Sequence, residues 1–154
     1  FFHELPALVD AAKRSAGTAH YDDLLHRLHA ALADPARGPM LERAASAQYQ
    51  AVLIDEFQDT DALQYEIFHR LFAGGRLFFV GDPKQAIYAF RGADVFAYMR
   101  AKRDAGGTPY ALDTNFRSEA PLIGAVNATF SRRLGTFVLK DIPFTAVRPP
   151  TRVS

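Results

Sequence analysis

The 154-residue sequence contains no cysteine, which excludes a disulfide framework and any metal site built from thiolates. No apolar run approaches the roughly 18 residues that suggest a membrane span, so we expect a soluble protein. No GxxxxGK[ST] motif occurs, so the loop that wraps nucleotide phosphates in many hydrolases is missing from these residues. No charge of one sign dominates either: 18 basic residues face 17 acidic ones, and overall charge predicts neither nucleic-acid binding nor its absence.

What the sequence does contain is organised around residues 51–60, AVLIDEFQDT. The apolar run Val52-Leu53-Ile54 shows no polar alternation, which predicts a strand buried on both faces, as in a parallel sheet flanked by helices. Ligands in such sheets bind outside the carboxyl ends of the strands. Asp55 and Glu56 follow the run directly and are therefore expected at that edge.

Helical periodicity surrounds this strand. Three helices are predicted before it: one ending near Gly17, one stopped by Asp34-Pro35, and one over residues 40–48. Further helices are predicted after Thr60 or Asp61, after Asp94 and after Ser118, since these residues can cap a helix.

Two further strands are expected at residues 77–80 and 110–112. Alternating strands and helices imply an α/β fold with a parallel sheet and right-handed crossovers, preceded by a helical N-terminal segment. The second apolar strand runs into Gly81-Asp82-Pro83, so polar residues again arrive at a carboxyl end.

Three ordered strings carry a family resemblance: DEFQDT from Asp55, GDPKQAIYAFRGAD from Gly81, and LDTNFRS from Leu112. Together they resemble the second, third and fourth motifs of the superfamily 1 (UvrD/Rep-like) DNA helicases, and within them most closely the RecB-like branch. The resemblance implies part of a RecA-like P-loop NTPase fold, with ATP and Mg²⁺ as cofactors.

Carried over to this sequence, the resemblance makes Asp55 the Mg²⁺ carboxylate and Glu56 the catalytic base for ATP hydrolysis. Gln85 would sense the γ-phosphate or the attacking water, because an amide can donate to one and accept from the other. Without the motif, Gln85 would be interpreted as a loop amide bonded to its own backbone.

In the fourth motif, Arg117 resembles the arginine that reaches the γ-phosphate, where a guanidinium offsets developing charge. The alternative is a surface ion pair with Glu119 or Asp113. Phe116 stands where the family usually has a tyrosine stacked on adenine. Phenylalanine keeps the aromatic face and loses the hydroxyl.

Tyr88, Phe90 and Arg91 are the expected DNA-facing residues. Aromatic rings can stack on bases of any sequence, and arginine adds phosphate attraction. The alternative for the two rings is core packing. Because the third motif links ATP to DNA in the family, Arg91 is also a candidate coupling residue.

The resemblance further implies a bacterial cytosolic helicase and exonuclease subunit that moves along single-stranded DNA, unwinds duplex DNA in break repair, and associates with RecC-like and RecD-like subunits. Residues 1–50 would lead into the motor, 51–131 would belong to its first RecA-like domain, and 132–154 would form an irregular exit. Because the phosphate loop is missing, we expect an internal fragment that is inactive alone and prone to self-association. The alternatives are a UvrD/Rep-type helicase without a nuclease, or a non-catalytic module that binds DNA or a partner.

Overall fold

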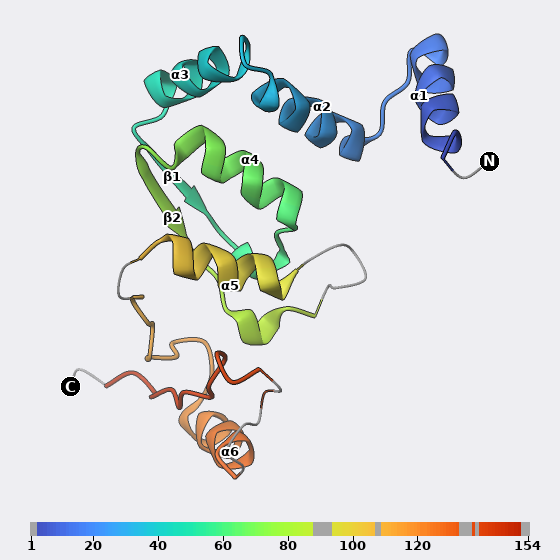
Figure 1. Cartoon of the computed structure of the whole chain (residues 1–154). Helices are drawn as coiled ribbons and strands as arrows, with labels where there is room; N and C mark the ends of the chain where they lie inside the picture. The colour runs from blue at the N-terminus through green and yellow to red at the C-terminus, as the bar shows by residue number, and fades with distance from the viewer. Residues whose placement is uncertain (1–2, 88–93, 107–108, 133–136, 138, 152–154) are drawn as a thin grey trace.

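A computed structural model describes residues 3–87, 94–106, 109–132, 137 and 139–151. It is rich in helices and contains a small parallel sheet, which confirms the predicted α/β class (Figure 1). In chain order the elements are α1 (Leu5–Ala16), α2 (Tyr21–Ala33), α3 (Gly38–Gln48), β1 (Ala51–Ile54), the 3₁₀ turn η1 (Phe57–Asp59), α4 (Ala62–Phe72), β2 (Arg76–Phe79), the 3₁₀ turn η2 (Pro83–Gln85), α5 (Val95–Asp104) and α6 (Ala120–Phe130).

The three N-terminal helices confirm the predicted stop signals. Gly17 ends α1 in the left-handed region, at φ 64°, where glycine carries no steric penalty. Asp34, extended before Pro35, ends α2. Helix α1 buries no residue and stands apart from the body (Figure 1), tied to α2 by an ion pair of 2.7 Å between Lys13 and Asp23. Helices α2 and α3 pack on α4.

The sheet consists of β1 and β2, paired in parallel with Ile54 beside Phe79. Side chains of both strands meet α4 and α5 in a core that includes Phe57, Tyr65 and Ala101. The ring centroids of Phe57 and Phe79 lie 4.3 Å apart. Both helices thus cover the same face of the sheet.

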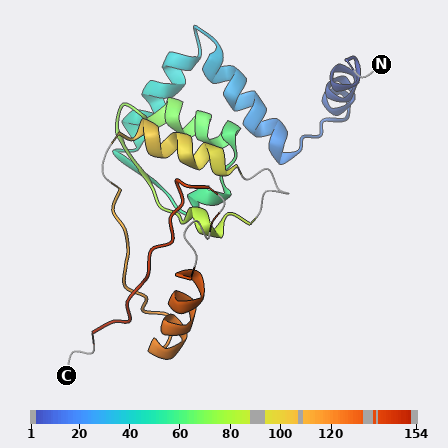
Figure 2. The same ribbon diagram turned by 60° about the horizontal axis from the view of Figure 1, so that its bottom comes forward.

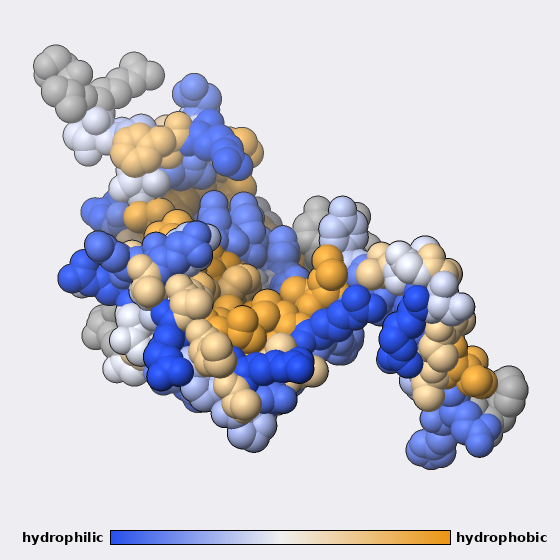
Figure 3. All heavy atoms as spheres, turned by 90° about the horizontal axis from the view of Figure 1, so that it is seen from above, coloured by the Kyte–Doolittle hydropathy of each residue, from blue (hydrophilic) through white to orange (hydrophobic). Residues whose placement is uncertain are grey.

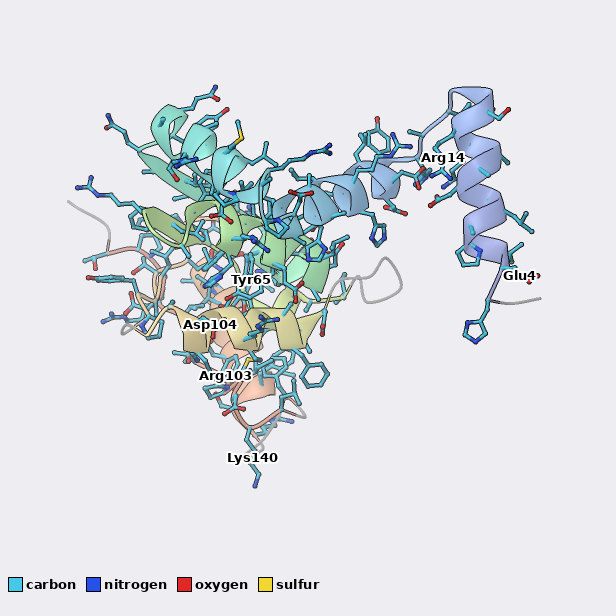
Figure 4. The ribbon with its side chains drawn as sticks, turned by 45° about the horizontal axis from the view of Figure 1, so that its top comes forward. Glu4, Arg14, Tyr65, Arg103, Asp104 and Lys140 are labelled. Carbon is cyan, nitrogen blue, oxygen red and sulfur yellow. The ribbon has the colours of Figure 1, made fainter. Side chains whose placement is uncertain are left out.

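A partly buried hydrogen bond joins the two covering helices. Tyr65 of α4 points toward Asp104 of α5 (Figure 4), and its hydroxyl donates to Oδ2 at 2.5 Å. Burial raises the pKa of Tyr65, and the bond to the carboxylate raises it further. Tyr65 itself is only 1% exposed.

The expectation that the strands are buried on both faces is wrong for this structure. Leu53 is 65% and Phe78 51% exposed, whereas Ile54 and Phe79 pack against the core. The reason is coverage: α4 and α5 lie on one face, and nothing in the described residues covers the other. All four residues of β1 are apolar, yet within the described chain only one of its two faces packs against other elements.

The predicted third strand at 110–112 is also wrong. Tyr110 and Leu112 are almost fully exposed and form no ladder, because no described strand edge lies beside them. Their chain continues to a single parallel bridge between Thr114 and Arg148.

Helix α6 is held by the C-terminal segment, since the Asn127 side chain bonds both the N–H and the C=O of Val147. Figure 2 shows α6 on the far side of α4 and α5 from α1–α3. None of the helices in the described ranges is long and apolar enough to cross a membrane.

Candidate functional site

The carboxyl ends of both strands meet at one edge, as predicted. Beyond the ladder, the N–H of Val80 donates to the C=O of Ile54 at 2.9 Å, and the N–H of Phe57 donates to the C=O of Val80 at 2.9 Å. These bonds hold the turn that follows β1 against the turn that follows β2. Asp55 and Glu56 are consequently neighbours of the loop that begins at Gly81.

Glu56, which follows β1, has an unusual backbone conformation. Its φ is 51° and its ψ 39°, and it is the one non-glycine residue with positive φ in the described chain. A left-handed residue with a Cβ costs roughly 1–2 kcal/mol, so the surroundings must hold it. Phe57, 1% exposed, supplies one anchor by packing in the core directly after the turn.

Gln58 supplies the second anchor. Its side chain is 2% exposed, and its amide makes two hydrogen bonds in opposite senses. Nε2 donates to Oε2 of Glu56 at 2.7 Å, and Oε1 accepts from the backbone N–H of Asp82 at 3.0 Å. One side chain thus connects the turn after β1 to the loop after β2.

Gly81 permits this close approach. A Cβ built there would lie 2.6 Å from Oε1 of Gln58 and 3.0 Å from the backbone N of Phe57. Real Cβ atoms essentially never come within 3.0 Å of another heavy atom. The glycine is required because the two turns touch backbone to backbone.

Asp82 organises the loop that carries Gln85. Its carboxylate accepts from the Lys84 backbone at 3.0 Å, pairs with the Lys84 ammonium at 2.6 Å, and accepts from Gln85 Nε2 at 3.3 Å. Burial works to raise the pKa of Asp82, but the bonds from Lys84 and Gln85 outweigh it and leave the pKa below its usual value. The carboxylate is therefore ionised at neutral pH and fixes the loop.

An open hollow of about 560 Å³ lies where the two turns meet. The side chains lining it are polar apart from one: Glu56, Gln58, Asp59, Lys84, Gln85 and Ile87. The structure thus brings Glu56 and Gln85 to one surface, as the strand pattern predicted. Gln85 makes its side-chain bond to Asp82 rather than to its own backbone.

Asp55 is exposed and directly precedes Glu56, although it does not line the hollow. Its Oδ1 accepts from the backbone N–H of Glu56 at 2.9 Å, and Oδ2 has no partner within the described chain. Asp55 and Glu56 are exposed carboxylates, the hard oxygen ligands that Mg²⁺ prefers. Within the described residues, however, no group of three or more His, Cys, Asp or Glu side chains is placed to hold a metal ion.

Phe116 and Arg117 lie on the loop before α6 and are not among the residues that line the hollow. Asn115 shapes this loop by accepting from the N–H groups of Arg117 and Ser118, both at 2.9 Å. Both side chains are exposed, Phe116 at 79%. The alternative for Arg117, an ion pair with Glu119 or Asp113, is not formed in the part of the chain that the structure describes. Asp113 pairs with Arg148 instead.

The expected DNA-facing residues Tyr88, Phe90 and Arg91 lie outside the described residues. Two residues of the site, Gln58 and Asp82, have no role predicted from the sequence, although their side chains bond to Glu56 and Gln85. The sequence does hold a partial indication for Gln58. It directly follows Phe57, an apolar residue expected in the core, and a buried amide requires hydrogen-bond partners.

Comparison with known proteins assigns the chain to a family. Residues 2–106 match the UvrD/REP helicase N-terminal domain family. The RecBCD enzyme subunit RecB of Escherichia coli is 43% identical over 148 residues, which cover 94% of this chain and 12% of that protein. The RecB subunits of Haemophilus influenzae and Mycolicibacterium smegmatis are 44% and 43% identical over 132 residues each, covering 82% and 83% of this chain and 11% and 12% of those proteins.

The chain therefore spans about an eighth of the length of these relatives. The family match covers more than half of the chain and includes both strand ends that build the hollow. On that evidence, the chain belongs to the UvrD/Rep helicase N-terminal domain family and is similar to RecB.

Proposed function

We propose that this chain is a segment of an ATP-dependent DNA helicase and exonuclease subunit of the RecB type. The protein that contains it would couple ATP hydrolysis to movement along single-stranded DNA and to duplex unwinding in double-strand break repair. The observation that carries the proposal is the shared hollow, where Glu56 and Gln85 face one space from the ends of two parallel strands. Residues 51–131 would form part of the first motor domain.

The roles follow from the chemistry of each side chain. Glu56 would take a proton from the attacking water, whose oxygen bonds to the γ-phosphorus while the bond to the β,γ-bridging oxygen breaks and ADP leaves. Gln85 would orient the water or the γ-phosphate through its amide. Mg²⁺, held by Asp55 when bound, would neutralise phosphate charge.

Two further residues would complete the nucleotide contacts from the loop before α6. Arg117 would approach the γ-phosphate and offset the charge that develops in transfer. Phe116 would stack on the adenine. The exposure of both side chains leaves them available for these contacts.

DNA would run past the segment that follows η2, with Tyr88, Phe90 and Arg91 as the contacting residues. Because the relatives are named as RecB subunits of a RecBCD enzyme, we propose RecC-like and RecD-like partners and a bacterial cytosolic location.

The test is Glu56→Gln in the intact protein. Loss of the base should lower DNA-stimulated ATP hydrolysis by about 10²- to 10⁴-fold while nucleotide and DNA binding survive. Glu66→Gln is the matched control, since Glu66 lies on α4 and pairs with His29 and Arg100 away from the hollow. Unchanged hydrolysis in Glu56→Gln would contradict the assignment.

The 154-residue chain by itself should not hydrolyse ATP, because it lacks the phosphate loop. Measurable DNA-stimulated hydrolysis by that chain would contradict the proposed division of the nucleotide site between this segment and another.

A further inference from the structure

We propose that Gln58 is a positioning residue: its amide holds the Glu56 carboxylate in place and ties it to the loop that carries Gln85. The inference rests on the proposed function, because it concerns the reaction assigned to Glu56. It adds a residue to that reaction and a physical link between the two strand ends.

The direction of the amide is fixed by its partners. The backbone N–H of Asp82 can only donate, so it must face Oε1, and the Glu56 carboxylate can only accept when ionised, so it must face Nε2. A flipped amide would place two donors together at one end and two acceptors at the other. Only a group with one donor and one acceptor satisfies both neighbours.

Burial makes this arrangement rigid. Gln58 is 2% exposed and lies in the 3₁₀ turn directly after the core residue Phe57, and its Oε1 would lie 2.6 Å from a Cβ built at Gly81. Glu56, in contrast, is exposed and has a strained backbone. The buried amide therefore restrains a carboxylate that would otherwise rotate freely in water.

The link also joins the two halves of the site. The Asp82 N–H begins the loop in which the Asp82 carboxylate binds both Lys84 and Gln85. A shift of that loop, for example when DNA or nucleotide contacts it, would pull on Gln58 and hence on Glu56. Gln58 is placed to keep the base and the γ-phosphate sensor at a constant separation.

The test uses two variants of the intact protein. Gln58→Met keeps the length of the side chain and removes both hydrogen bonds. Gln58→Glu keeps an acceptor for the Asp82 N–H and replaces the donor by a group that repels the Glu56 carboxylate. Because a misplaced reacting group can cost about 100-fold, we expect kcat for ATP to fall by about 10- to 100-fold in both variants, with KM changed by less than about threefold.

Gln64→Met is the matched control. Gln64 carries the same amide on α4, where it accepts from the Asp61 backbone in a helix cap, and it has no contact with the hollow. Its kcat should equal that of the wild type. A thermal unfolding scan on each variant identifies any that fails to fold, and Gln58→Glu then provides the measurement if Gln58→Met is lost.

A double-mutant cycle separates positioning from a general structural role. If Gln58 acts through Glu56, Gln58→Met should cause no further loss of single-turnover hydrolysis once Glu56→Gln is present. Losses that multiply, or a wild-type kcat in folded Gln58→Met and Gln58→Glu, would overturn the inference while leaving the proposed function intact. Full hydrolysis in Glu56→Gln alone would instead overturn the proposed function, and the inference with it.

Discussion

Gly81→Ala is the sharpest structural test of how the two strand ends are held together. The added Cβ would lie 2.6 Å from Oε1 of Gln58 and 3.0 Å and 3.1 Å from the backbone nitrogens of Phe57 and Gln58. Two of these atoms belong to the backbone, and the third is fixed by hydrogen bonds, so the clash cannot be relieved by rotation of one free side chain. The turn after β1 must move away from the loop after β2.

The magnitude follows from the cost of overpacking. An extra methyl group in a closely packed site costs typically about 1–3 kcal/mol, and the bond from Phe57 N–H to Val80 would weaken as well. We therefore expect the free energy of unfolding to fall by about 2 kcal/mol or more. In the intact protein, kcat for ATP should fall with it, because Gln58 can no longer hold both partners.

Urea unfolding measures the first effect and steady-state ATP hydrolysis the second. Gly124→Ala is the matched control, because a Cβ there meets nothing within 4 Å and the residue lies inside α6. Replacing a helical glycine by alanine should leave stability unchanged or raise it by up to about 1 kcal/mol. Equal stability of Gly81→Ala and the wild type would refute the close contact between the turns.

Two further predictions concern the fold. Tyr65→Phe should lower the free energy of unfolding by about 1–2 kcal/mol, which thermal denaturation can measure. This is the low end for a hydrogen bond to a charged group, because the Asp104 carboxylate retains Arg100 and solvent as partners. Because the pKa of Tyr65 is raised on folding, the wild type should also lose stability as the pH rises above about 10, and Tyr65→Phe should show less of that loss. The 154-residue chain should self-associate through the uncovered sheet face and the open edges of its two strands, where Leu53 and Phe78 are exposed. Figure 3 shows further hydrophobic surface between hydrophilic side chains on the upper face. Light scattering should find oligomers, which Phe78→Ser reduces, and a stable monomer at high concentration would contradict the prediction.

Local sequence patterns were enough to predict the positions of the helices, of β1 and β2, and of the edge at which the site forms. Local signals were sufficient for this: Gly17 and Pro35 stop helices, Asp61 and Asp94 cap them, and each of these effects acts within a few residues. The parallel direction of the strands follows from the helix between them, which is why Glu56 and Gln85 could be expected on one side.

Long-range packing, in contrast, sets which faces of the sheet are covered and which side chains hold the site. Apolar strands predict burial on both faces, yet burial depends on which elements pack over each face, and Leu53 stays 65% exposed although it pairs with Phe78 in the sheet. Residues 110–112 failed as a strand for the same reason, since a strand requires a partner edge. The role of Gln58 could likewise not be predicted from the sequence. Its amide accepts from the backbone N–H of Asp82, 24 residues away, and only the contact between the two turns brings that donor within reach.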